Sequence, residues 1–242
     1  MTKTVTYNTA GLLFKAAADL IIQLYEQAIA DKGSFTIALS GGNTPKKLYE
    51  LLATPVYAKK INWKNIYLFW SDERCVPVSD EENNSHMASQ ALLNNVPVPK
   101  ENIFPVPVNF EPAKAAARYE QMIRTFFKDT QPHFDLVLLG LGEDGHTASL
   151  FPGTDILDEK KILVKQVYLK EKKMFRVSFT LPLINDAKHI LFLVTGKEKS
   201  SILKKIFTKP VKKPAYPAQL IKPVKGKLFW YLDKAAASSL TN

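Results

Sequence analysis

Short apolar runs alternate along the chain with longer segments in which apolar residues recur every three or four positions. Runs of this length are typical of strands, and uninterrupted ones suit strands buried on both faces of a parallel sheet. They predict strands at residues 35–39, 66–70, 136–139, 190–194 and 228–232, and an alternating pattern predicts another at 176–180. The helical spacing predicts helices at residues 8–31, 45–52, 87–93 and 112–128, and a further helix that ends near residue 207.

Strands and helices that alternate in this order predict an α/β fold. We expect a three-layer, Rossmann-like arrangement in which helices cover both faces of a mainly parallel sheet. We expect residues 1–242 to form a single α/β domain. The proline-rich stretch at 97–107 could bound a small second lobe, although its composition is not that of an interdomain linker.

Several residues predict where helices begin or end. Gly33 is a suitable stop for the first helix. Thr44 is a good N-cap for the second helix, with Pro45 as its first residue. Ser85 is a candidate cap for the helix at 87–93, and Asp233 is expected to start a short terminal helix.

Polar and reactive side chains follow four of the predicted strands. Residues 136–139 lead into GLGEDGHT at 140–147, and residues 66–70 lead into SDERC at 71–75. Residues 35–39 lead into SGGNT at 40–44, and residues 190–194 lead into TGKEK at 195–199. Ligands of open α/β sheets bind outside the carboxyl ends of the strands. We therefore expect the four strand ends to meet in one site.

The loop at 40–44 is the first candidate for anion binding. It lies between a strand and a helix, and the free N–H groups of a helix N-terminus bind phosphate well. Ser40 and Thr44 add hydroxyl donors. The loop matches neither common nucleotide-binding glycine pattern, and a plain tight turn explains its glycine pair equally well.

His146 is the best candidate for a general base. Imidazole titrates near neutral pH, and Asp144 or another carboxylate could orient it. A hydrogen-bonded structural role is the alternative. Cys75 beside Arg74 could act as a nucleophile only with a general base next to it, so this interpretation is disfavoured. The residues alone thus indicate acid–base chemistry on a small phosphate ester.

Composition indicates the cellular compartment and the kinds of ligand to expect. The single cysteine excludes an intrachain disulfide, and the first residues lack a signal-peptide pattern, so we expect a cytoplasmic protein. No apolar run reaches membrane length, and no residue pattern indicates a metal site or a cofactor. The formal charge is +10, with many lysines at 197–227. The simplest interpretation of these lysines is a solvated surface. Attraction of small anionic substrates is the second interpretation, and nucleic-acid binding is the third.

Longer motifs add a family resemblance. GLGEDGHTASLFPGT at 140–154, LSGGNTPKKLYELL at 39–52 and WSDERCVP at 70–77 closely resemble 6-phosphogluconolactonases. The resemblance continues through RVSFTLPLIN at 176–185 and VTGKEKS at 194–200, in the same order along the chain. It implies a fold shared with glucosamine-6-phosphate deaminase.

The resemblance also implies an activity and a set of site residues. The activity is hydrolysis of 6-phosphoglucono-δ-lactone, with His146 as the base that activates water, Asp144 and Asp72 in the active-site motifs, and Arg74 placed to bind substrate or steady the oxyanion. Which of Asp72 and Asp144 contacts His146 stays open. The implied phosphate ligands are Ser40, Gly41, Gly42, Asn43, Thr44, Arg176 and Lys199.

Two alternatives remain within the same fold. One is an aminosugar-phosphate deaminase or isomerase, but the residues after His146 continue as Thr-Ala-Ser-Leu-Phe-Pro, where deaminases usually run towards Asn-Glu-Pro. The other is a non-enzymatic sugar-phosphate sensor, which normally carries an added DNA-binding domain. We expect a small phosphorylated lactone as the partner, neither nucleic acid nor membrane, and a monomer or homodimer.

Overall fold

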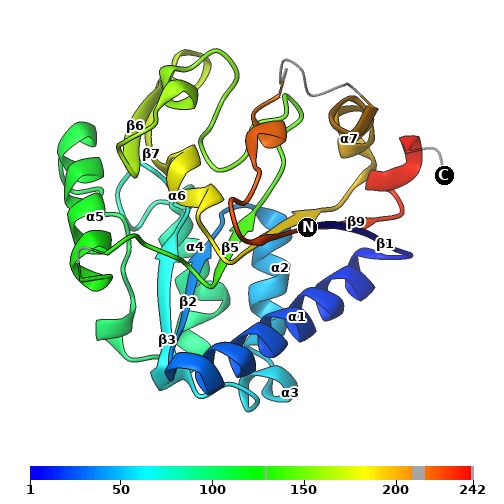
Figure 1. Ribbon diagram of the computed structural model, residues 1–242, viewed down its shortest axis with the longest axis horizontal. Coiled ribbons are helices and arrows are strands. Elements are labelled where there is room, and N and C mark those ends of the chain that lie inside the picture. Colours follow the sequence, from blue (N-terminus) through cyan, green and yellow to red (C-terminus); the bar gives the residue numbers. More distant parts are fainter. Residues whose placement is uncertain (129, 209–215, 241–242) are drawn as a thin grey trace.

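The computed structural model describes residues 1–128, 130–208 and 216–240, and its centre is a six-stranded sheet (Figure 1). All neighbouring strands of this sheet are parallel. Their order across the sheet is β1 (Thr2–Tyr7), β9 (Lys227–Asp233), β8 (His189–Val194), β5 (Leu136–Leu139), β2 (Phe35–Leu39) and β3 (Ile66–Trp70). The predicted α/β class is confirmed, and β1 is an additional strand that the sequence pattern did not reveal.

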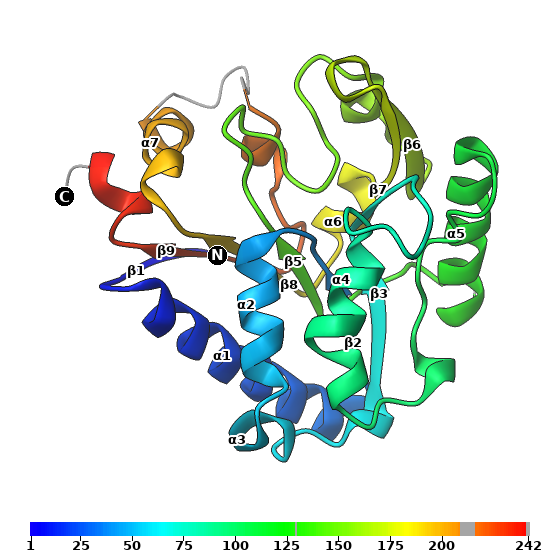
Figure 2. The same ribbon diagram turned by 180° about the vertical axis from the view of Figure 1, so that it is seen from behind.

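Helices cover both faces of the sheet, so the predicted three layers are present (Figures 1 and 2). Helices α1 (Ala10–Lys32) and α2 (Asn43–Leu52) pack together on one face, and α4 (Asn84–Ala91) packs beside α2. Helices α5 (Pro112–Phe126), α6 (Leu181–Asn185) and α7 (Ser200–Thr208) lie on the other face, and α3 (Pro55–Ala58) is a short turn of helix after α2. No helix in the described part of the chain is long and apolar enough to span a membrane.

A second, three-stranded sheet lies beside the first (Figure 1). It is antiparallel, in the order β4 (Asp72–Arg74), β7 (Met174–Phe179), β6 (Val164–Leu169). Residues 72–74, which follow the predicted strand at 66–70, form β4 because these polar residues pair with β7. The small second sheet is therefore built from 72–74 and 164–179, and the proline-rich stretch contributes no strand to it.

Two of the predicted helix starts were wrong. Helix α2 begins at Asn43, and the residue before it, Gly42, has a φ of 99°, which glycine adopts readily. The Thr44 hydroxyl forms a hydrogen bond with Thr195 and does not cap the helix. Helix α4 is capped by Asn83, which accepts a hydrogen bond from the His86 N–H, and Ser85 lies inside the helix. The stop at Gly33 is confirmed: its φ is 75° and its N–H bonds to the Ile29 carbonyl.

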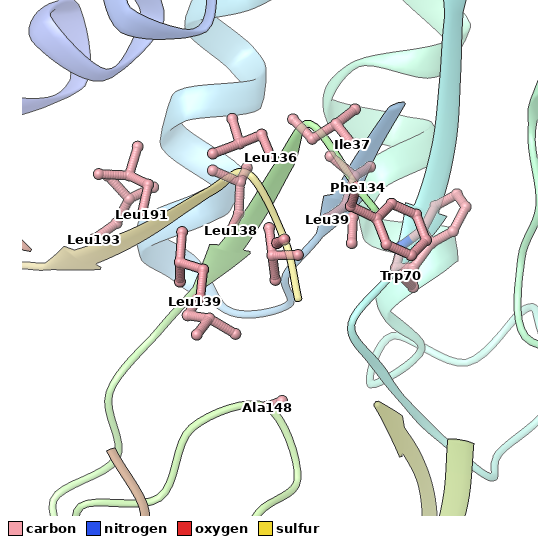
Figure 3. Close-up of a cluster of buried hydrophobic side chains, with 14 of the residues drawn as sticks. Ile37, Leu39, Trp70, Phe134, Leu136, Leu138, Leu139, Ala148, Leu191 and Leu193 are labelled. Carbon is pink, nitrogen blue, oxygen red and sulfur yellow. The ribbon is translucent and has the colours of Figure 1, made fainter. Parts of the chain in front are cut away.

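Strand β5 anchors the centre of the core. Its four side chains have no exposed surface, and Figure 3 shows its leucines between Ile37 and Leu39 of β2 on one side and Leu191 and Leu193 of β8 on the other. Burying one leucine contributes roughly 2 kcal/mol of transfer free energy. The loop that begins at Gly140 therefore starts from a fully buried strand.

Candidate active site

The predicted meeting of strand ends takes place in the structure. Strands β8, β5, β2 and β3 are adjacent, and a cavity of about 470 Å³ is lined by residues that follow their carboxyl ends. The chain runs from β2 outward to β3 and then returns to β5, so the direction of winding changes between β2 and β5. This switch point is where open α/β sheets bind ligands.

Ten of the eleven predicted site residues line this cavity, and Asp144 supports one of them from outside. They come from segments up to about 160 residues apart in the sequence. The ten are Ser40, Gly41, Gly42, Asn43, Thr44, Asp72, Arg74, His146, Arg176 and Lys199.

Glycines shape the loop that carries His146. The Gly142 N–H donates to the His146 carbonyl at 2.9 Å, and the Gly145 N–H donates to the Gly142 carbonyl at 3.0 Å. Gly145 has a φ of 81°, and a Cβ atom on Gly142 would overlap the His146 imidazole. The loop therefore closes tightly beneath the histidine ring only with glycine at these two positions.

Asp144 is the carboxylate that contacts His146. Its Oδ1 lies 2.5 Å from His146 Nδ1 and also accepts the His146 backbone N–H at 3.0 Å. Partial burial raises the pKa of Asp144, but the hydrogen bonds from His146 outweigh it and hold the pKa below its ordinary value. An ionised carboxylate needs a donor, so Nδ1 carries the proton. In the neutral ring Nε2 then has the free lone pair of a base.

Asp72 has different partners. Its Oδ2 accepts the Ser149 hydroxyl at 2.6 Å and lies 3.8 Å from Arg176 Nη1, and its side chain is only 6% exposed. The question left open by the sequence is thereby answered: Asp144 pairs with the imidazole, and Asp72 faces the Arg176 guanidinium across the floor of the cavity.

Three cations surround the cavity. Arg74 Nη1 donates to the Glu82 carbonyl at 2.6 Å, and Lys199 Nζ lies 3.9 Å from a Glu143 carboxylate oxygen. The Nε atoms of Arg74 and Arg176 are buried without a partner among the described residues. Burial lowers the pKa of Arg176, and Asp72 opposes this effect, so the guanidinium stays charged. Two buried N–H donors without acceptors fit an anionic ligand.

The 40–44 loop places a helix N-terminus at the cavity. Tyr49 fixes its first residue, because the hydroxyl accepts the Ser40 N–H at 2.9 Å and donates to the Ser40 carbonyl at 2.8 Å. Asn84 packs against Gly41 so closely that a Cβ atom there would overlap its amide. The N-terminus of α2, with its positive dipole end, can therefore receive an anion.

Four residues at or near the cavity were missed by the sequence reasoning: Tyr49, Asn84, Thr195 and Phe151. Asn84 Nδ2 donates to the Asp72 carbonyl at 2.9 Å, and Thr195 Oγ1 lies 2.8 Å from Thr44 Oγ1. Asn84 lies at the start of a helix and carries no distinctive spacing, so only the folded chain reveals its contact. Thr195 follows the predicted strand at 190–194, and its place at that strand end was the available signal.

Cys75 lacks the properties of a nucleophile. Burial raises the pKa of its thiol to about 11, with a smaller contribution from Glu73. The thiol is therefore protonated at neutral pH. Among the described residues, no cluster of three His, Cys, Asp or Glu side chains could hold a metal ion.

Fold and site together define a doubly wound α/β protein whose cavity is lined by three cationic side chains and by His146, which Asp144 contacts. The family model of glucosamine-6-phosphate isomerases/6-phosphogluconolactonase matches residues 8–230. The chain belongs to this family, and the resemblance expected from the motifs is confirmed.

Individual relatives agree with the family assignment. A 6-phosphogluconolactonase from Nostoc sp. is 43% identical over 233 residues, which cover 95% of this chain and 94% of that protein. The structure of 6-phosphogluconolactonase from Trypanosoma cruzi is 31% identical, covers 100% of this chain and 98% of its own, and has a TM-score of 0.87. A monomeric glucosamine-6-phosphate deaminase, at 22% identity, TM-score 0.82 and coverage of 98% and 99%, shares the fold.

Proposed function

We propose that the chain hydrolyses 6-phosphoglucono-δ-lactone to 6-phosphogluconate, the second step of the oxidative pentose phosphate pathway. The lactonase names of relatives such as the Nostoc protein support the activity. The observation that carries the mechanism is the contact between Asp144 Oδ1 and His146 Nδ1, because it makes Nε2 a base at the edge of an anion-binding cavity.

The proposed reaction is a water attack on the lactone carbonyl. His146 Nε2 takes a proton from water, the water oxygen bonds to the carbonyl carbon, and the carbonyl oxygen becomes an oxyanion. Arg74 supplies positive charge for that oxyanion. The ring C–O bond then breaks, and the imidazolium returns its proton to the departing alkoxide. The base contributes roughly 10²–10⁴-fold to the rate.

The phosphate end of the substrate is assigned to the cationic groups of the same cavity. Arg176, Lys199 and the N-terminus of α2 are the groups that suit it, since all three carry positive charge or free N–H donors. Binding energy from the phosphate then orients the carbonyl towards the base. The same geometry supports a single catalytic domain, because both sheets contribute residues to the cavity.

The second candidate is deamination of glucosamine 6-phosphate, which the family description includes. The residues after His146 favour the lactonase, and Phe151 and Ser149 of this segment have specific contacts in the site. A cytoplasmic location and a monomer or homodimer stay predictions.

One pair of assays separates the candidates. The lactone is generated in solution by oxidation of glucose 6-phosphate, at mildly acidic pH to slow spontaneous hydrolysis, and its disappearance is followed with and without the protein. Ammonia release from glucosamine 6-phosphate is measured in parallel. We expect accelerated lactone loss and no ammonia. Ammonia release without lactone hydrolysis would establish the deaminase instead. Saturable binding of the lactone and of glucosamine 6-phosphate, with turnover of neither, would favour a sensor.

A further inference from the structure

Phe151 touches two of the predicted site residues without lining the cavity itself. Its ring stacks on the His146 imidazole, with centroids 4.0 Å apart and planes inclined by 23°. The guanidinium carbon of Arg176 lies over the same ring, 5.5 Å from its centroid. One aromatic side chain therefore contacts both the proposed base and a cation assigned to the phosphate.

The backbone around Phe151 is held by hydrogen bonds within its own turn. Its carbonyl accepts the Thr154 hydroxyl at 2.7 Å and the Thr154 N–H at 3.3 Å. The preceding residue, Leu150, is fully buried, and its N–H donates to the Thr147 carbonyl at 2.9 Å. The Phe151 ring is thus held on a rigid turn, which is what a group that orients others requires.

The imidazole of His146 needs a second restraint besides Asp144. The hydrogen bond to Asp144 fixes the position of Nδ1, but the ring plane can still turn about that contact. Stacking on Phe151 fixes the plane. The two contacts together decide where Nε2 points, and a misplacement of about 1 Å in a reacting group can cost roughly 10²-fold in rate.

The guanidinium of Arg176 has a similar need. Asp72 Oδ2 lies 3.8 Å from its Nη1, beyond hydrogen-bond distance, and its Nε has no partner among the described residues. An aromatic ring attracts the face of a guanidinium, whereas oxygens bind its N–H edges. Phe151 therefore supports Arg176 while leaving those edges available to a phosphate.

We propose that Phe151 is a positioning residue that fixes His146 and Arg176 on one ring and so sets the spacing between the reacting carbonyl and the phosphate. The proposal rests on the lactonase function argued above and adds to it a residue that holds the base and a phosphate-binding cation in place.

The kinetic test compares Phe151→Leu, which removes the ring, with Phe151→Tyr, which keeps it. Each contact is of a size that changes an equilibrium about 2- to 10-fold. We expect Phe151→Leu to lower kcat and to raise KM, each by about that factor or more, and Phe151→Tyr to restore both. In an Arg176→Ala background the effect on KM should disappear while the effect on kcat remains. Phe175→Leu, a change at an exposed ring on the same strand as Arg176, is the matched control and should leave both constants unchanged.

A spectroscopic measurement tests the contact without activity. Protons of an imidazole stacked on a phenyl face resonate upfield in the NMR spectrum. The chain has four histidines, and the His146 signals are those missing from the spectrum of His146→Ala. We expect Phe151→Leu to move the His146 ring signals downfield. Phe151→Met is a second variant with the same expected shift, for use if Phe151→Leu unfolds. Phe175→Leu should not move them.

The outcomes separate this proposal from the proposed function. A wild-type protein that hydrolyses no lactone overturns the function, while displaced His146 signals in Phe151→Leu still establish the contact. An active wild type together with a folded Phe151→Leu variant of unchanged kcat and KM overturns the positioning role. Unmoved His146 signals in both non-aromatic variants overturn the contact itself.

Discussion

Replacing Asp144 with asparagine tests how the His146 base is set up. In the native chain the ionised carboxylate accepts from Nδ1, so the lone pair lies on Nε2. An asparagine amide can present its NH₂ group to Nδ1 instead. The imidazole proton then moves to Nε2, and the base is lost although its position hardly changes.

The expected loss of rate follows from the geometry of this contact. A positioned base contributes roughly 10²–10⁴-fold. The Asp144 side chain is 47% exposed, so water can replace part of its effect, and we expect the low end: a decrease in kcat of about 10²-fold, which corresponds to about 3 kcal/mol in the activation barrier. The stability cost should be small, since half-exposed ion pairs contribute at most about 1 kcal/mol.

The assay is initial-rate lactone hydrolysis, corrected for the spontaneous reaction, with urea unfolding to compare stability. Asp155→Asn is the matched control, because Asp155 is also an exposed aspartate with an ion pair, to Lys165 at 2.9 Å, and it lies outside the cavity. A folded Asp144→Asn variant with the wild-type kcat would refute the reasoning, because the tautomer of His146 would then be irrelevant to the reaction.

Three further predictions concern the rest of the site. Arg176→Ala and Lys199→Ala should each raise KM several-fold more than they lower kcat. The control Lys197→Ala, at a residue outside the cavity, should change neither constant. An unchanged KM in both Arg176→Ala and Lys199→Ala would exclude the proposed phosphate contacts. Cys75→Ser should retain wild-type kcat, because burial raises the thiol pKa to about 11; a large loss in this variant would reinstate the nucleophile. Burial raises the pKa of Glu73 from 4.5 to about 7, although three backbone N–H donors lower it in part. Between those two pH values the folded protein therefore keeps a proton on Glu73 that the unfolded chain releases. The free energy of unfolding of the wild type, measured relative to Glu73→Gln, should therefore fall as pH rises from about 4.5 to 7. A difference between the two proteins that stays constant across this range in urea unfolding would contradict the assignment.

The strands that carry the site were predictable because their own side chains determine them. The runs that form β2, β3, β5 and β8 are apolar almost throughout, and the polar segments after them mark the ends that meet at the cavity. Strand β1 escaped prediction because it lies at the sheet edge with mostly exposed side chains, and its pairing with β9 defines it. Strand β4 consists of three polar residues and exists only through its pairing with β7.

The same distinction applies within the site. The pairing of Asp144 with His146 could be anticipated, because the two residues are two positions apart in a glycine loop. The contacts of Asp72 with Ser149 and Arg176 join residues from three separate segments, and the ring of Phe151 joins its own loop, through His146, to Arg176 of β7. The Thr44 hydroxyl bonds to Thr195 across the sheet, so its local tendency to cap a helix was overridden by a tertiary contact.

The rate of lactone hydrolysis by His146→Ala tests the central claim most directly. His86→Ala is the control, since His86 lies on the outside of α4 with Gln90 as its side-chain partner. We predict that His146→Ala retains the fold and substrate affinity but loses at least about 10²-fold in kcat, while His86→Ala matches the wild type. Equal kcat values for a folded His146→Ala variant and the wild type would contradict the assignment of His146 as the water-activating base.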